Sequence, residues 1–218
     1  MLIVIPYKYM PGPELKYCLR GIEMFIDNPE VVIIGDKTPF KVQHIPFKDH
    51  RDIQFKERNV FQKLLLVKED FLFFNDDFFL LKPYENKYHY SDTIQQQKES
   101  YHITNNFRKI LQNTLNLYGN IANYFRHGPI FIERGKLETL SNLDWNIPWG
   151  YCTKSIYCHV NHIVGEDYPD LKIRVPMQNT QIVNLIKNRP YFSTGDHAIN
   201  QPMIKVLETL YPKKSKYE

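Results

Sequence analysis

The chain has 218 residues, and its 28 Lys and Arg residues against 24 Asp and Glu residues give a net charge of +4. Apolar residues make up 43% of the chain and aromatic residues 14%, which supplies a hydrophobic core and excludes a mainly disordered protein. No apolar run reaches the roughly 18 residues of a membrane-spanning helix, and the N-terminal segment lacks the pattern of a signal peptide. The three cysteines, Cys18, Cys152 and Cys158, lack CxxC spacing. We therefore expect one cytoplasmic domain over residues 1–218 with reduced thiols.

The first part of the chain alternates short apolar runs, typical of buried strands, with segments whose apolar residues recur at helical spacing. The predicted elements are a strand at 2–6, a helix at 13–26, strands at 30–36 and 41–47, a helix at 55–70, and two apolar strands on either side of residues 75–77. This β-α-β-β start indicates an α/β sheet with at least two parallel strands.

The second part of the chain continues the alternation more weakly. Its predicted elements are a polar helix at 103–125, a strand at 129–133, a short helix at 134–143, a helix at 152–163, a strand at 171–175, a helix at 180–188, a strand at 191–194 and a final helix at 199–210. There is no internal repeat and no low-complexity linker. We therefore expect a single α/β domain with a Rossmann-like, mixed but mostly parallel sheet flanked by helices.

Two adjacent carboxylates, Asp76 and Asp77, follow the apolar run FLFF and precede FFLL. A plain Asn-Asp-Asp turn would account for them, although a tight hairpin normally takes Asn-Gly or Asp-Gly at such a place. The C-terminal edge of the strands in an open α/β sheet is where ligands bind. Because Mg²⁺ and Mn²⁺ bind through one or two carboxylates together with substrate phosphates, we expect a metal site here. Asp77 is the expected direct ligand, Asp76 a contact to metal or substrate, and Asn75 either a substrate contact or a cap of the turn.

The run ELKYCLRGIE at 14–23, with FLFFNDDFFLLKP at 71–83, resembles the core of the Stealth family of sugar-phosphate and glycosyl transferases. It is similar as well to a group of short phage- and bacteria-encoded glycosyltransferase-like proteins, whose pattern also resembles RNVFQK at 58–63, HGPIFIERGKLE at 127–138 and YFSTGD at 191–196. The "WVDGsD" block and the Arg-rich block of the long Stealth proteins have no counterpart in this chain. The resemblance therefore implies a nucleotide-sugar glycosyltransferase with a GT-A-like fold.

The resemblance also implies contacts to the nucleotide-sugar donor. Pro6 and Tyr7 follow the first strand, where GT-A enzymes commonly seat the base, although Tyr7 could simply pack on the sheet. Arg20 matches an arginine of the family helix and would reach the donor phosphates, unless it is an ordinary paired helix arginine. Asp36 ends the second strand, where it could contact ribose or base or only cap the strand, and Lys63 matches a basic position before the acids.

The catalytic side rests on three further matches. His127 corresponds to a family histidine that would bind metal or acceptor, with a turn histidine as the alternative. Asp170 is the better candidate for a general base, and an ion pair between Asp170 and Lys172 is its alternative. Asp196 follows a late strand, and GT-A enzymes often take a metal ligand from near the C-terminus.

The sequence thus predicts a transferase that uses Mn²⁺ or Mg²⁺ and a nucleotide-sugar, with UDP-sugar favoured. Residues 1–100 would form the nucleotide-sugar-binding half, and residues 101–218 the acceptor side and C-terminal half. The acceptor is either a surface glycan or a hydroxymethylated base in phage DNA. Two alternatives remain open: a Stealth-like hexose-1-phosphate transferase, and a non-catalytic module that binds sugar or DNA.

Overall fold

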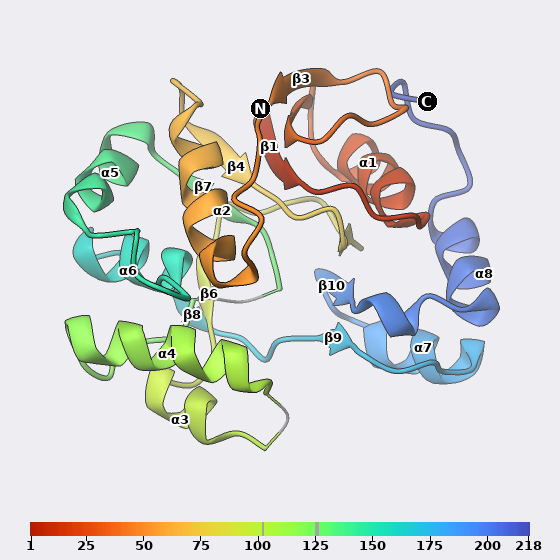
Figure 1. Ribbon diagram of the computed structural model, residues 1–218. Helices are drawn as coiled ribbons and strands as arrows, with labels where there is room; N and C mark the ends of the chain where they lie inside the picture. Colours follow the sequence, from red (N-terminus) through yellow and green to blue (C-terminus); the bar gives the residue numbers. More distant parts are fainter. Residues whose placement is uncertain (102, 125–126) are drawn as a thin grey trace.

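The computed structural model describes residues 1–101, 103–124 and 127–218, and its centre is a five-stranded sheet (Figure 1). The strand order is β3-β2-β1-β4-β7. β1, β2, β3 and β4 are parallel, and β7 is antiparallel to β4. The strands are β1 (Leu2–Tyr7), β2 (Glu30–Gly35), β3 (Gln43–Pro46), β4 (Phe71–Phe73) and β7 (Ile130–Ile132).

Two helices cover opposite faces of this sheet, which explains why β1 reads as a continuous apolar run. Ile3 and Ile5 of β1 pack in one cluster with residues of α1 (Glu14–Phe25). Val4 points the other way and packs in a second cluster with Phe61 and Leu64 of α2 (Lys56–Leu65). Because successive side chains of a strand face opposite sides, both faces must be apolar for the strand to be buried.

After β4 the chain enters a second sheet, which has three strands in the order β5-β10-β9. β5 (Phe78–Leu80) is antiparallel to β10 (Tyr191–Thr194), and β10 is parallel to β9 (Lys172–Ile173). Phe79 and Phe192 from this sheet form a core with α7 (Asn179–Ile186) and α8 (Gln201–Leu210). β9, β10, α7 and α8 form the lower right of the view in Figure 1.

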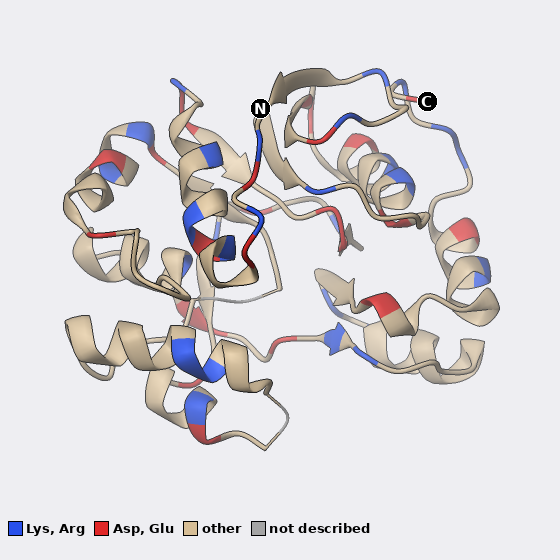
Figure 2. Cartoon of the chain, in the orientation of Figure 1, with Lys and Arg blue, Asp and Glu red and all other residues tan. Residues whose placement is uncertain are grey.

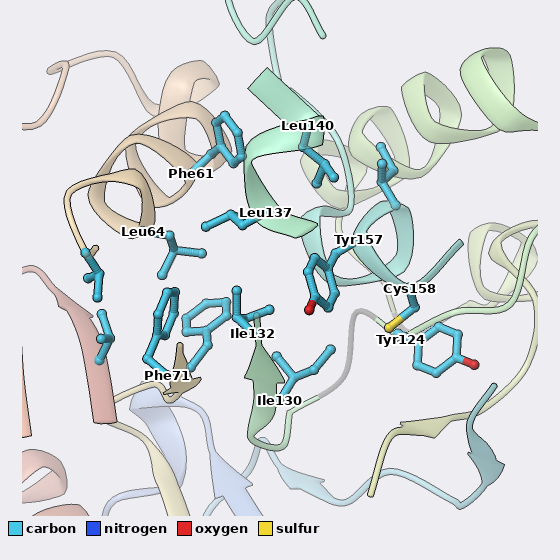
Figure 3. Packing of buried hydrophobic residues seen from close by; sticks show 14 of the residues in the cluster. Phe61, Leu64, Phe71, Tyr124, Ile130, Ile132, Leu137, Leu140, Tyr157 and Cys158 are labelled. Atoms are coloured by element: carbon cyan, nitrogen blue, oxygen red, sulfur yellow. The ribbon is translucent and has the colours of Figure 1, made fainter. Parts of the chain in front are cut away.

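The remaining elements belong to neither of these two sheets. They are the paired strands β6 (His89–Tyr90) and β8 (Glu166–Asp167), and the helices α3 (Ile94–Glu99), α4 (Asn105–Tyr118), α5 (Arg134–Glu138) and α6 (Thr153–Val160), with short 3₁₀ turns at Ile53–Phe55, Thr139–Asn142 and Asp196–Ala198. Figure 3 shows Leu137 from α5 and Tyr157 from α6 meeting Ile132 of β7 in the same cluster as Phe61 and Leu64. None of the helices in the described part of the chain combines the length and apolar character that crossing a membrane requires.

The expected single α/β domain with a mixed, mostly parallel sheet flanked by helices is confirmed. Both sheets take strands from either side of residue 100. The predicted helix at 103–125 is too long: α4 ends where Gly119 takes a positive φ of 72°. The predicted helix at 55–70 ends at Leu65, while Val67 beyond it still packs into the core. The β6 and β8 pair and α3 were not predicted, because such short elements carry too few periodic residues.

Gly35 is required where β2 ends, which gives a first testable prediction. Its φ is 136°, and a Cβ there would lie 1.9 Å from the carbonyl oxygen of Tyr7. We expect Gly35→Ala to lower the free energy of unfolding by about 1–3 kcal/mol, measured by urea denaturation. Gly135→Ala in α5 is the matched control, since nothing lies within 4 Å of its Cβ position, and we expect it to be neutral or slightly stabilising. Equal urea midpoints for the two variants would contradict the strained backbone at Gly35.

Candidate active site

The two predicted acids lie in a turn that joins the two sheets. The backbone N–H of Phe78 donates to the carbonyl of Asn75 at 3.3 Å, so that Asp76 and Asp77 occupy the middle of the turn. β4 before the turn pairs with β1 and β7, whereas β5 after it pairs with β10. The turn is therefore no hairpin, and it carries both acids at the C-terminal end of β4, beside the end of β1.

Asp76 lies in an environment that disfavours its charged form. Burial, then the neighbouring charge of Asp77 and that of Glu14, raise the pKa of Asp76 to about 7. An opposite charge brought to this place would reverse the effect, since a cation stabilises the ionised carboxylate. The turn thus has the electrostatics of a site that favours a cation.

Asp77 is held by one partner and has capacity for another. Its Oδ2 forms an ion pair of 2.9 Å with Nζ of Lys172, and the Asp77 side chain is 21% exposed. Its Oδ1 is buried and has no hydrogen-bond partner among the described residues. The backbone N–H of Thr194 donates to the carbonyl of Asp77 at 3.4 Å, which fixes the turn to β10. A buried carboxylate oxygen without a partner is costly, and it fits a site that takes up a donor or a metal ion.

His127 and Asp170 form a hydrogen-bonded pair beside the turn. Nδ1 of His127 lies 2.6 Å from Oδ2 of Asp170, and the His127 backbone N–H donates to Oδ1 at 3.3 Å. Burial lowers the pKa of His127 and outweighs Asp170, whose hydrogen bond and charge raise it. The charge of Lys172 also lowers this pKa, and the charge of Asp77 raises it. The lowered pKa favours the neutral imidazole. With Asp170 accepting the proton on Nδ1, Nε2 remains free to accept another.

The alternative pairing of Asp170 with Lys172 is wrong, because each has a different partner. Asp170 pairs with His127, and Lys172 pairs with Asp77. Both residues still belong to one polar cluster, because His127 interacts with Asp170, Lys172 and Asp77. Asp170 therefore lies near the turn that carries Asp76 and Asp77, which we call the carboxylate turn.

Three charged residues that the sequence analysis did not select also belong to this cluster. Lys154 on α6 is buried, its Nζ donates to the carbonyl of Gly128 at 2.7 Å, and burial lowers its pKa to about 8 despite the charges of Asp170 and Asp77. Glu57 on α2 is buried, which raises its pKa to about 7. Glu14 at the start of α1 interacts electrostatically with Asp196 and Asp77. In the sequence all three look like solvated helix residues, so no local signal marks them.

The predicted base and ribose contacts lie at the same edge of the sheet. Pro6 and Tyr7 end β1, and burial together with the charge of Asp76 raises the pKa of Tyr7. Asp36 follows β2, is exposed, and accepts a hydrogen bond of 2.8 Å from the backbone N–H of Tyr9. Lys63 is buried below this edge, where its Nζ donates to the Tyr7 carbonyl at 3.2 Å.

Arg20 and Asp196 are the remaining two predicted site residues. Arg20 forms two hydrogen bonds with the Glu218 carboxylate, at 2.6 and 2.8 Å, and donates to the carbonyl of Tyr211 at 3.0 Å. It therefore ties α1 to the end of the chain. Asp196 is exposed and interacts electrostatically with Glu14, which also interacts with Asp77. Within the described ranges, no three His, Cys, Asp or Glu side chains come together as a metal site.

No protein-family model and no curated protein sequence matches the chain. Among solved structures, it is similar to a glycosyltransferase involved in the glycosylation of the major capsid of PBCV-1, with a TM-score of 0.42, 14% identity, and 97% of this chain and 98% of that chain covered. It is similar to the glycosyltransferase GlyE of Streptococcus pneumoniae TIGR4 (TM-score 0.41, 8% identity, 92% of this chain), of which it spans 54%. It is also similar to the inositol-1-phosphate CTP transferase of T. maritima (TM-score 0.44, 9% identity, 96% and 95% covered). At such TM-scores and identities, none of these likenesses identifies a reaction.

Proposed function

We propose that this protein is a glycosyltransferase that moves a sugar from a nucleotide-sugar to an acceptor. The observation that carries the proposal is the carboxylate turn itself. Asp76 and Asp77 lie at the C-terminal end of β4, and Asp77 keeps a buried oxygen that has no partner among the described residues. In an open α/β sheet this edge forms the crevice in which ligands bind.

A divalent ion fits the donor atoms of the turn, which makes Mn²⁺ or Mg²⁺ part of the proposal. Asp77 would hold the ion through its free oxygen, with Asp76 as a second carboxylate and the donor phosphates completing the ligands. When bound, the ion supplies positive charge that stabilises the diphosphate leaving group. Asn75, Pro6 and the other residues at the ends of β1 and β2 would bind and orient the nucleoside.

On the donor side, each strand end has its own task. Tyr7 packs in the core at the end of β1, and Asp36 presents an exposed carboxylate at the end of β2. A ribose hydroxyl is a group that such a carboxylate recognises, while Tyr7 would support the nucleoside from within the core. Lys63 supports the edge from below, because its Nζ donates to the Tyr7 carbonyl and pairs with Asp49 at 2.9 Å. Arg20 stabilises the fold by tying α1 to Glu218 at the end of the chain.

On the acceptor side, His127 would remove the proton of the attacking hydroxyl. The acceptor oxygen forms a bond to the anomeric carbon, the bond from that carbon to the diphosphate breaks, and the proton passes to Nε2 of His127. Asp170 holds the ring through Nδ1 at 2.6 Å and stabilises the imidazolium that forms. The acceptor is either a surface glycan or a hydroxymethylated base of DNA. The exposed Asp196, which interacts electrostatically with Glu14, would contact metal or acceptor.

Binding and product analysis together test the proposal. Protein stripped of bound metal is mixed with Mn²⁺ and each of a panel of nucleotides and nucleotide-sugars, and its Tm is measured. The matching nucleotide at about 100 times its Kd should raise the Tm by about 5–10 °C, and prolonged incubation should release nucleoside diphosphate. UMP instead of UDP would show transfer of the sugar phosphate, as in the hexose-1-phosphate alternative. A flat Tm with every nucleotide would reject the transferase and favour a binding module.

A further inference from the structure

A groove of about 490 Å³ lies beside α2, outside the carboxylate turn. One wall is the loop that follows β3, with Lys48 and Arg51, and the other is the first two turns of α2, with Arg58 and Gln62. Lys and Arg residues recur along α2 and the chain that leads into it (Figure 2). We call this feature the basic groove.

Partly buried polar contacts hold the loop after β3 to α2, so the two walls of the basic groove are fixed to one another. Asn59 of α2 accepts from the backbone N–H of His50 at 3.0 Å and donates to the His50 carbonyl at 3.2 Å. Asp49, on the same loop, pairs with Lys63 of α2 at 2.9 Å. The loop is therefore held to the helix at two successive residues, and the groove is formed before any ligand arrives.

The charges that line the groove are not balanced within the protein. Lys48, Arg51 and Arg58 have no carboxylate partner in the parts of the chain that the structure describes. The single acid of the lining, Asp49, is already neutralised by Lys63. Clefts that gather one sign of charge concentrate counter-ions and charged ligands.

Arg58 adds a second and independent indication. Its Nε is buried and has no hydrogen-bond partner among the described residues, while its guanidinium lies 5.7 Å from the ring centre of Phe55. A buried donor without an acceptor is unfavourable, so such a position favours an anionic acceptor. The planar guanidinium matches phosphate oxygens, which it binds through charge-assisted hydrogen bonds.

We propose that the basic groove binds a phosphate group that does not belong to the nucleotide held at the Asp76–Asp77 turn. This phosphate comes either from a small free compound or from a phosphodiester chain. Since Lys48, His50 and Arg51 are exposed, the groove can hold one phosphate while a chain continues beyond it. The inference does not require glycosyl transfer.

Binding without metal separates the groove from the carboxylate turn. Wild-type protein in EDTA is titrated with inorganic phosphate, with pyrophosphate, and with a short fluorescent duplex DNA at low and high salt. Arg58→Gln and Arg51→Gln should each lower the affinity for the probe about tenfold. Lys205→Gln removes the same charge at an exposed position of α8 and should change the affinity little. Asp77→Asn should bind the probe as wild type does, so a failed groove and a failed transferase give different results.

Each outcome decides the proposal. Binding of phosphate or pyrophosphate that competes with DNA identifies a small phosphate compound as a sufficient ligand. Salt-dependent binding of DNA alone identifies a phosphodiester chain. If none of the three probes binds, or if Lys205→Gln weakens binding as much as Arg51→Gln does, the basic groove is no site. Arg51 is exposed, so its variant tests the groove even if Arg58→Gln disturbs packing on Phe55.

Discussion

Asp77→Asn is expected to lower metal-dependent donor turnover by about 10²–10³-fold while the protein stays folded. Asparagine keeps the shape of the side chain but removes the charge that a divalent ion and the departing diphosphate require. The Asp77 side chain is only 21% exposed, and asparagine has nearly the same volume, so the substitution keeps the packing of the turn. Donor hydrolysis is measured as released nucleoside diphosphate, and Mn²⁺-dependent thermal shifts report binding.

Two controls give this result its meaning. Asp167→Asn removes an exposed acid of β8 and should leave turnover and thermal shifts unchanged. Lys172→Met breaks the same ion pair from the other side while keeping the Asp77 carboxylate. If Lys172→Met and Asp77→Asn lose activity equally and both keep the Mn²⁺ shift, then Asp77 acts through its ion pair and is no metal ligand.

His127→Asn is expected to lower turnover by about 10²–10⁴-fold at neutral pH, the usual contribution of a general base. Since burial lowers the pKa of His127, wild-type activity should stay level at neutral pH and fall only below the ordinary histidine range, as the ring takes up a proton. The pH profile of kcat/KM measures this acid limb. In His127→Asn the limb should disappear from the residual activity.

Asp170→Asn separates orientation from proton transfer. The carboxylate of Asp170 raises the pKa of His127 through its hydrogen bond and its charge, against the larger effect of burial. Its replacement should therefore lower activity and move the acid limb to still lower pH. An acid limb that stays in place in both variants would assign it to another group and remove His127 from the proposed mechanism.

The strands that carry the site were predictable because burial on both faces leaves a plain signal. LIVIPY and EVVIIG are continuous apolar runs, and both lie in the middle of the five-stranded sheet. The position of the acids followed from the same logic, since polar residues directly after such a run come at the end of a strand. Local sequence therefore located the carboxylate turn at the edge of the sheet.

The partners of the charged residues were not predictable, since they depend on contacts between distant segments. Asp170 and Lys172 are two residues apart, yet Lys172 pairs with Asp77, 95 positions away. Arg20 meets Glu218, 198 positions away. The burial of Lys154 was not predictable either. Most lysines on helices are solvated, and nothing in the local sequence shows that this one is only 4% exposed.

The passage of the chain from one sheet to the other at residues 75–78 has a consequence for dividing the protein. β5 receives its partner β10 from residues 191–194, and β4 receives β7 from residues 130–132. A fragment that stops near residue 100 would expose both strands as unpaired edges, which are prone to aggregate. It would also lose the Thr194 and Lys172 contacts that hold Asp77. The carboxylate turn is therefore a product of the whole chain, and split or minimal versions of the protein have to keep both segments together.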